Sequence, residues 1–194
     1  MDTLSIANFV RIVYGNWCFV PPDSESVAAL DAYDVKILSE IQANAALSNQ
    51  EIADRVGLSA SPCSRRIRQL EEAGIISERV ARLAPAKVGL ELSVIIHIRM
   101  DRHTPERFAN FEAIISGFPE VQECYLITGQ EADYQLKVAV PGMDEYQRFL
   151  LEKVTRIEGV IGVHSSFVLR KPIDTTRLPL TYLAKRVERR GRRG

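Results

Sequence analysis

The chain has 194 residues, of which 46% are apolar and 26% charged, a balance typical of a soluble protein with one large or two small domains. Its 25 basic and 25 acidic residues cancel, which excludes a uniformly basic surface for nucleic acid and requires any such binding to use a local patch. The three cysteines are far apart and no run is apolar enough to span a bilayer, so we expect a cytoplasmic protein without disulfides or membrane association.

Residues 1–29 are predicted to form a flexible N-terminal arm that ends in the linker-like Pro21-Pro22-Asp23-Ser24. The arm has apolar stretches, but the acidic Asp2 and the lack of a small-residue cleavage site argue against a secretory signal. Sequence upstream of the natural start and a partner-docking arm are the alternatives.

Three helices are predicted between residues 30 and 76. Asp31 is a good N-cap for the first helix, which should end near Asn44. Ser48 and Glu51 have the spacing of a capping box and indicate the start of the second helix. Gly57 then favours a sharp turn, because glycine tolerates a positive φ. Two short helices joined by a glycine-containing turn are typical of a helix-turn-helix.

The third helix is predicted to begin at Ser59, which can cap it, and to stop at Gly74. Its apolar residues Cys63, Ile67 and Leu70 recur with helical spacing and should face inward. The opposite face is small, polar and basic, as in a recognition helix that enters the major groove of DNA. The candidate DNA-binding residues on this surface are Ser59, Ser61, Ser64, Arg65, Arg66 and Arg68.

Arginine can make a bidentate contact with guanine, whereas serine can bind base edges or the backbone. We therefore predict base contacts from Arg65 and Arg68, supported by Ser61 and Ser64. Arg66 lies toward the flank of the helix and is predicted to contact phosphate. Taken alone, these residues also allow an ordinary helical hairpin with a solvated charged face.

Residues 77–90 are predicted to form a connector hairpin, which would serve either as a wing of the DNA-binding domain or as a simple link. Its basic residues Arg79, Arg82 and Lys87 could contact phosphate, and a solvated linker is the alternative.

Residues 91–172 alternate between strand-like and helix-like periodicity. Strands are predicted from Leu92 to Met100, Val121 to Thr128, Tyr134 to Val140 and Ile161 to Leu169. Helices are predicted after Thr104-Pro105 and after Pro141-Gly142. The order β-α-β-β-α-β predicts a ferredoxin-like α+β domain, in which a four-stranded antiparallel sheet carries both helices on one face.

The other face of this sheet is expected to be apolar. The residues assigned to it are Ile95, Cys124, Leu126, Ala139, Val163 and Phe167. Because such a face needs cover, we predict that it packs against a second copy of the chain in a two-fold dimer. A dimer also suits DNA, since it can place two recognition helices roughly 34 Å apart on a palindrome-like site.

Residues 173–194 are predicted to form a basic C-terminal tail, in which the strongly basic stretch from Lys185 to Gly194 should be flexible. Its lysines and arginines could add non-specific attraction to phosphate and steepen the salt dependence of DNA binding. A tail that only improves solubility is the alternative.

From residue 30 to about 180 the sequence resembles the Lrp/AsnC (leucine-responsive and asparagine-responsive) transcriptional regulators of bacteria and archaea. The resemblance is carried by LDAYDVKILSEIQANA, GLSASPCSRRIRQLEEAGII, ARLAPAKVGL, CYLITGQEADYQLKVAVP and VHSSFVLRKPIDTTRLPL. It implies an N-terminal, winged helix-turn-helix domain that binds double-stranded operator DNA. It also implies a ferredoxin-like domain for effector binding and oligomerisation, and hence a regulator of amino-acid metabolism.

The resemblance further implies an effector loop, which maps onto Thr128, Gly129, Gln130, Glu131 and Asp133. In the family the effector is usually a free amino acid, held where effector domains meet. Backbone N–H groups around Gly129 could receive its α-carboxylate, and Asp133 could receive its α-ammonium. Asp133 lies four residues after Gly129, whereas the family pattern has a spacing of three. A carboxylate that only caps the turn is therefore the alternative for Asp133.

The family mechanism is regulation by linkage, in which an effector that favours one arrangement or assembly of dimers alters DNA affinity by the same coupling free energy. We accordingly expect a homodimer that assembles further into tetramers or octamers. No cofactor, metal site or catalytic residue is predicted, since no nucleophile grouping, phosphate loop or ligand cluster stands out.

Two other function classes remain open on the sequence. Some proteins with the same two-domain outline are haem-pathway enzymes that decarboxylate sirohaem, for which His97 and His103 would be the candidate histidines. The basic recognition helix would have no purpose in such an enzyme. The other alternative is a ligand-binding oligomer that has lost operator recognition.

Overall fold

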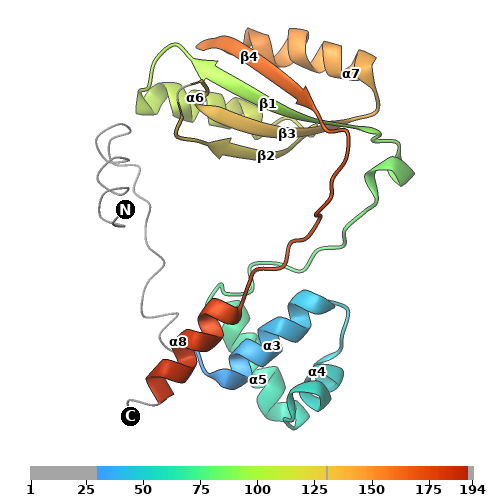
Figure 1. Ribbon diagram of the computed structural model, residues 1–194, viewed down its shortest axis with the longest axis vertical. Coiled ribbons are helices and arrows are strands. Elements are labelled where there is room, and N and C mark those ends of the chain that lie inside the picture. The colour runs from blue at the N-terminus through green and yellow to red at the C-terminus, as the bar shows by residue number, and fades with distance from the viewer. Residues whose placement is uncertain (1–29, 130, 192–194) are drawn as a thin grey trace. The chain divides into compact units, whose positions relative to one another are not determined.

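A computed structural model describes residues 30–129 and 131–191 of the chain. These residues divide into two compact units, a helical unit of residues 30–82 and 173–191 and a sheet unit of residues 83–172 (Figure 1). The predicted N-terminal arm, Gln130 and residues 192–194 lie outside the described part. Within the described part, no helix has the length and apolar character needed to cross a membrane.

The helical unit begins with three helices, α3 (Ala32–Ala43), α4 (Asn49–Val56) and α5 (Ala60–Glu72). Asp31 caps α3, and its carboxylate accepts hydrogen bonds from the backbone N–H groups of Tyr33 and Asp34. Ser48 and Glu51 form the predicted capping box, with the Ser48 N–H donating to Glu51 Oε2 at 2.8 Å. Gly57 has the positive φ of 75° that the predicted turn requires. The caps at the starts of α3 and α4 and the turn at Gly57 are therefore as the sequence predicts.

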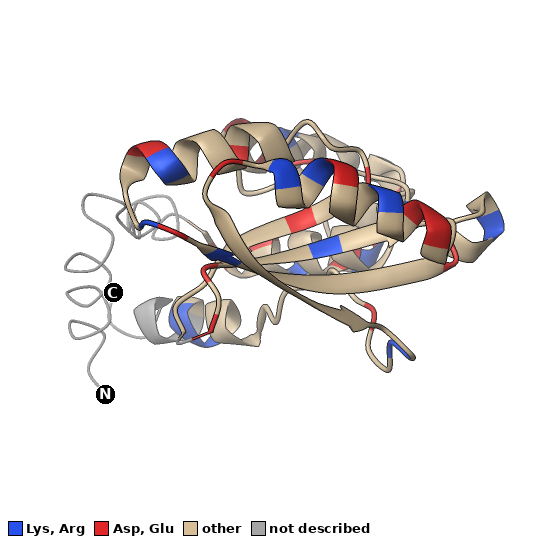
Figure 2. Ribbon diagram, turned by 90° about the horizontal axis from the view of Figure 1, so that it is seen from above, with Lys and Arg blue, Asp and Glu red and all other residues tan. Residues whose placement is uncertain are grey.

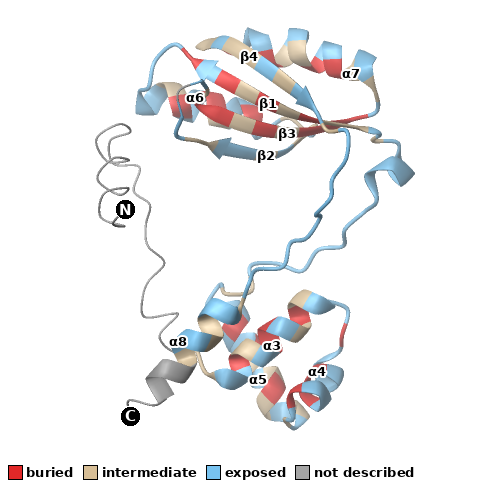
Figure 3. Cartoon of the chain, viewed as in Figure 1, coloured by how far each residue is buried: buried red, intermediate tan, exposed pale blue. Residues whose placement is uncertain are grey.

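The core of the helical unit forms where these three helices meet. Cys63, Ile67 and Leu70, the predicted inward stripe of α5, are 0%, 2% and 3% exposed. Figure 3 shows the buried faces of the helices turned toward one another. The other buried members of this core are Ile37, Leu38, Ile41, Leu47, Ile52, Ala53 and Val56. The stripe thus holds α5 in one orientation and leaves its opposite face outward.

The C-terminal segment belongs to the helical unit. Residues Thr181–Gly191 form a helix, α8, and Leu180 and Leu183 pack against the core of the three preceding helices. Just before α8, the Leu178 backbone N–H donates to Gln42 Oε1 at 2.7 Å. The Arg177 guanidinium donates to the Ala43 carbonyl at 3.2 Å. The stretch predicted to be a flexible tail, Lys185 to Gly194, is helical up to Gly191.

The connector between the two units is irregular. Within residues 77–90 the structure assigns no strand, so the predicted hairpin is wrong. The only regular element in this described stretch is a 3₁₀ turn, η1 (Pro85–Val88), which ends at Gly89 with a φ of 79°. Pro85 has no N–H to donate to a strand ladder, which disfavours a hairpin here.

The sheet unit contains strands β1 (Leu92–Met100), β2 (Val121–Leu126), β3 (Tyr134–Val140) and β4 (Val160–Phe167). They form one antiparallel sheet in the order β2-β3-β1-β4. Helix α6 (Pro105–Ile115) follows β1. Helix α7 (Met143–Arg148) follows β3 and continues through the short turns η2 (Phe149–Lys153) and η3 (Val154–Arg156). The α+β, ferredoxin-like arrangement is as predicted.

The core of the sheet unit lies on the side of the sheet that faces both helices. Val94, Ile96 and Ile98 of β1 are fully buried, and Met100 is 3% exposed. They share one cluster with Phe108 and with the remaining buried residues Phe111, Ile115, Tyr134, Leu136, Val138, Val140, Tyr146, Phe149, Val154 and Ile157. Residues from α6 and α7 thus cover the same face. Their outer sides carry lysine, arginine, aspartate and glutamate intermixed (Figure 2).

The face of the sheet that points away from the helices is polar, which contradicts the predicted apolar face. Cys124 and Leu126 pair with Leu136 and Tyr134, so they point toward the helices instead. Val163 and Phe167 do likewise, since they pair with buried residues of β1. Only Ile95 and Ala139 of the predicted set lie on the open face. Its other described members are Ser93, His97, Arg99, Glu123, Tyr125, Gln135, Lys137, His164 and Ser166.

The error arises from irregularities in both edge strands. The β2–β3 register shifts between Val121 and Glu123, and the β1–β4 register shifts between Arg99 and Met100. A bulge inserts one residue and so reverses which alternate positions face the core. Val121 and Leu126 both pack against the core although one is odd-numbered and the other even-numbered. Simple alternation along the sequence cannot anticipate such a reversal.

Candidate functional site

The outer face of α5 presents most of the predicted DNA-binding residues to solvent. Ser61, Arg65 and Arg68 are exposed, and Ser64 is half-buried. Among the described residues, neither a hydrogen bond nor an ion pair joins Arg65 to another side chain. Ser59 stands at the N-cap position of α5 but makes no capping hydrogen bond, so that part of its predicted role is wrong.

Arg66 differs from its neighbours because it is engaged inside the helical unit. Its guanidinium lies 2.8 Å from Asp31 Oδ2 and 2.9 Å from Asp34 Oδ1, at the beginning of α3. Asp34 is one of the few buried charged residues. Burial of the Arg66 guanidinium lowers its pKa, but the two carboxylates outweigh this and leave the pKa raised. Arg66 therefore ties α5 to α3.

A shallow hollow of about 490 Å³ lies beside α5. Ser64 and Arg68 line it from α5, and Asn49 lines it from the start of α4, with its amide N–H donating to Ser64 Oγ at 3.3 Å. Arg79 lines the far side and is paired with Glu71 at 2.9 Å. The connector thereby adds a basic side chain next to the recognition helix.

The predicted effector loop connects β2 to β3, and its residues lie in different surroundings. Thr128, Gly129 and Glu131 are exposed, and Gln130 lies outside the described residues. Asp133 is only 6% exposed. Its carboxylate accepts a hydrogen bond from the Met100 backbone N–H at 2.7 Å, and its Oδ1 lies 2.7 Å from His103 Nε2. This geometry joins the end of β1 to the loop.

A larger hollow, of about 600 Å³, lies where this loop meets the open face of the sheet. From the loop it is lined by Ile127, Gly129, Glu131 and Ala132. From the strands it is lined by His97, His164 and Ser166. Sequence reasoning missed His164 and Ser166. Their polar character at alternating positions of a strand was the available signal, but the open face had been assigned to the wrong residues.

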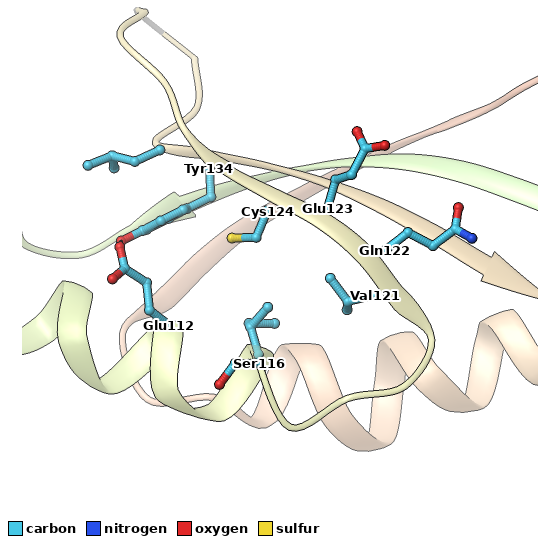
Figure 4. A pocket seen from close by; sticks show the side chains of 9 residues that line it. Glu112, Ser116, Val121, Gln122, Glu123, Cys124 and Tyr134 are labelled. Carbon is cyan, nitrogen blue, oxygen red and sulfur yellow. The ribbon is translucent and has the colours of Figure 1, made fainter. Parts of the chain in front are cut away.

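A third hollow, of about 340 Å³, lies between α6 and the edge strand β2 (Figure 4). Within it the Tyr134 hydroxyl donates to Glu112 Oε1 at 2.7 Å. Desolvation of the Cys124 thiol, with Glu112 nearby, raises its pKa to about 11. The thiol therefore stays protonated near neutral pH and is a poor nucleophile. Across the described residues, no three His, Cys, Asp or Glu side chains are arranged to hold a metal ion.

Comparison with known proteins agrees with this two-unit organisation. A family described as winged helix-turn-helix DNA-binding matches residues 30–77, and the Lrp/AsnC ligand binding domain matches residues 93–178. The leucine-responsive regulatory protein of Haemophilus influenzae is 39% identical over 152 residues, which cover 78% of this chain and 91% of that protein. The chain belongs to the Lrp/AsnC family of transcriptional regulators.

Other members of the Lrp/AsnC family show comparable similarity. The glutamate uptake regulatory protein of Zymomonas mobilis is 37% identical over 164 residues, which cover 84% of this chain and 99% of that protein. The crystal structure of a transcriptional regulator from Neisseria meningitidis in complex with L-Met is 40% identical, with a TM-score of 0.76. The matched region covers 79% of this chain and 99% of the Neisseria meningitidis chain. These relatives are regulators with helix-turn-helix domains, not enzymes, which argues against the sirohaem alternative.

Proposed function

We propose that this Lrp/AsnC regulator binds operator DNA in a sequence-specific manner and controls genes of amino-acid metabolism in response to a free amino acid. The observation that carries the proposal is the outward face of α5 with its exposed Arg65 and Arg68, held by a buried stripe in a domain of the helix-turn-helix type. In the same chain, a ligand-binding domain has a hollow at the predicted effector loop.

In the DNA complex, Arg65 and Arg68 contact base edges in the major groove, supported by Ser61 and Ser64. Ser59, at the start of α5, lies where a backbone N–H or a hydroxyl can reach phosphate. Arg66 could reach phosphate only if it exchanged a contact with Asp31 or Asp34 for one with DNA. We therefore assign most of the base discrimination to Arg65 and Arg68.

The effector is held beside the loop after β2. Gly129 offers a backbone N–H for the α-carboxylate, with the Thr128 hydroxyl close by in sequence. The exposed Glu131 lines the hollow and is better placed than the buried Asp133 to receive the α-ammonium. An amino-acid effector also fits the relatives, one of which was solved with L-Met while another is named as leucine-responsive.

The functional assembly is a homodimer that associates into tetramers or octamers. Two copies place two recognition helices on a two-fold site, which multiplies the specificity of a single helix. Family membership is the support for this assembly. The polar open face of the sheet would bury less apolar surface in a dimer than the apolar face predicted from the sequence. Sedimentation of the purified chain with and without amino acids reports the assembly directly.

The test is a DNA-binding titration with promoter fragments from the protein's own locus, in the presence and absence of each of the twenty amino acids. We expect tight binding to at least one fragment, and a change in affinity or assembly with at least one amino acid. Binding that is equal for every duplex, random sequence included, would contradict operator recognition. Unchanged affinity and assembly with all twenty amino acids would contradict the effector.

A further inference from the structure

The hollow at the effector loop has two chemically different sides. On the loop side, Gly129 supplies a backbone N–H and Glu131 a carboxylate, the complement of a zwitterionic amino-acid head group. On the strand side, His97, His164 and Ser166 present imidazole and hydroxyl groups. An amino acid whose head group binds at the loop would extend its side chain toward the strands.

The two histidines lie side by side on the sheet. His97 of β1 and His164 of β4 are direct cross-strand partners, and their ring centroids are 6.4 Å apart with the planes 29° from parallel. His97 Nε2 lies 3.2 Å from Gln135 Oε1 and donates to it, which fixes the His97 ring and leaves Nδ1 of the neutral imidazole as a hydrogen-bond acceptor. Ser166 follows His164 by two residues on the same strand and thus on the same face.

These groups favour some side chains over others. The His164 imidazole and the Ser166 hydroxyl can donate hydrogen bonds to carboxylate or carboxamide oxygens, and His97 Nδ1 can accept one from a carboxamide N–H. An aliphatic side chain in the same place would displace water from them without replacing its hydrogen bonds, and a site built for hydrogen bonding rejects such a ligand strongly. Arg99 follows His97 on the same face of β1 and adds positive potential near the strands.

We propose that His97, His164 and Ser166 form a polar side-chain subsite, which selects an amino-acid effector whose side chain ends in a carboxylate or a carboxamide over one with an aliphatic side chain. The proposal rests on the proposed function, since it takes the effector to be a free amino acid. It adds the ligand class and the residues that determine specificity.

The experiment is calorimetric titration of the full chain with L-glutamate, L-glutamine, L-leucine and L-methionine. We expect glutamate or glutamine to bind at least tenfold more tightly than either apolar amino acid. The glutamate and glutamine titrations distinguish a carboxylate from a carboxamide. The variants His97→Leu and His164→Leu should each reduce the preference at least tenfold, whereas His97→Gln, which keeps a hydrogen-bond donor and an acceptor, should retain most of it.

Ser93→Ala is the matched control, because Ser93 is on the same face of β1 but does not line the hollow. It should leave the preference unchanged, and circular dichroism of every variant should confirm an intact fold. Two results would overturn the subsite without contradicting an amino-acid effector. One is that leucine or methionine binds as tightly as glutamate and glutamine. The other is that the His97→Leu and His164→Leu variants fold and keep the preference. If none of the four amino acids bound, and none of the twenty changed DNA affinity or assembly, the effector proposal itself would be overturned.

Discussion

Arg65 and Arg66 are adjacent in sequence, yet α5 places them in different surroundings. Arg65 points to solvent, whereas the side chain of Arg66 is 26% exposed and lies between two carboxylates of α3. A helix turns by about 100° per residue, so neighbouring positions face different partners. The two arginines therefore make a matched pair, in which one tests DNA recognition and the other tests the fold.

Replacing Arg65 by Ala should weaken binding to the operator by about 1–3 kcal/mol, because a bidentate base contact is lost, and should relax base preference at one position. The thermal unfolding midpoint should not change. Fluorescence anisotropy with operator and random duplexes measures both affinities. An equal loss on the two duplexes would mean that Arg65 contacts only the backbone.

Replacing Arg66 by Ala should destabilise the helical unit by about 1–3 kcal/mol, because Asp34 stays buried without its charged partner. Urea unfolding followed by circular dichroism gives the change in free energy. Arg65→Ala is the control, because the same side chain is removed from the neighbouring exposed position. If Arg66→Ala were as stable as the parent, the ion pairs to α3 would have no structural role.

The carboxylates that cap α3 and α4 make the helical unit sensitive to acid. Burial raises the pKa of Asp31, but hydrogen bonds from Asp34 and the Arg66 charge outweigh it and leave the pKa below its ordinary 3.8. The Ser48 backbone N–H is the main cause that lowers the pKa of Glu51 below its ordinary 4.5. Because these carboxyls bind protons less tightly folded than unfolded, their stabilisation is complete above these ordinary values and is lost as the pH falls through the lowered pKa values.

We therefore expect the stability of the helical unit to fall as the pH drops below about 4.5, the ordinary pKa of Glu51. Asp31→Asn, which keeps a good N-cap residue but cannot ionise, should be less stable at pH 7 and should show a shallower decline on acidification. Unfolding curves at several pH values provide the measurement. A parent and a variant with parallel pH profiles would rule out Asp31 as a source of the acid sensitivity.

At the scale of elements, α8 completes the core of the helical unit. Leu180 and Leu183 contribute partly buried apolar surface, and the segment before α8 is hydrogen-bonded to Gln42 and Ala43 at the end of α3. Truncation after Pro179 should therefore destabilise this unit by roughly 1–3 kcal/mol, through exposure of apolar surface.

The matched control for this truncation is one after Arg190, which removes basic residues but keeps Leu180 and Leu183. Thermal unfolding of the two truncated chains gives the comparison, and only the longer deletion should lower the midpoint. Equal midpoints would mean that α8 does not contribute to the core. The salt dependence of DNA binding by the shorter deletion separately tests whether the last residues attract phosphate.

The elements that could be predicted from the sequence are those specified by local chemistry. Asp31, Ser48, Gly57 and Gly74 set helix boundaries through side-chain hydrogen bonds or a positive φ, and each stands where predicted. The inward stripe of α5 follows from helical spacing alone. Each of these signals lies within a few residues of the feature that it determines.

Features that depend on distant pairing could not be predicted in the same way. The faces of β2 and β4 are reversed by bulges that exist only in the paired sheet. Helix α8 packs against the helical unit through Leu183, with Leu180 just before it, and this core is built by residues 30–76. The hollow beside the effector loop likewise unites β1, β4 and the loop, three segments that are far apart in sequence.

At the scale of the whole molecule, two chain segments connect the sheet unit to the helical unit. The helical unit consists of residues from before and after the sheet unit, so the chain enters the sheet unit near residue 83 and leaves it near residue 172. A change in the sheet unit on effector binding is thus linked covalently to α5 through the connector and to α8 through the C-terminal segment. By reciprocity, the effector and the operator must alter each other's affinity by the same factor.

The most direct test of this account is the Kd for the protein's own promoter DNA, measured by anisotropy at fixed ionic strength with and without saturating effector. We expect preferential binding to the promoter over random duplex, and a change in Kd of about 5–150-fold on addition of effector, which corresponds to a coupling of about 1–3 kcal/mol. A protein that binds its effector but has the same Kd for the promoter in both conditions, or that fails to bind any duplex at low salt, would contradict it.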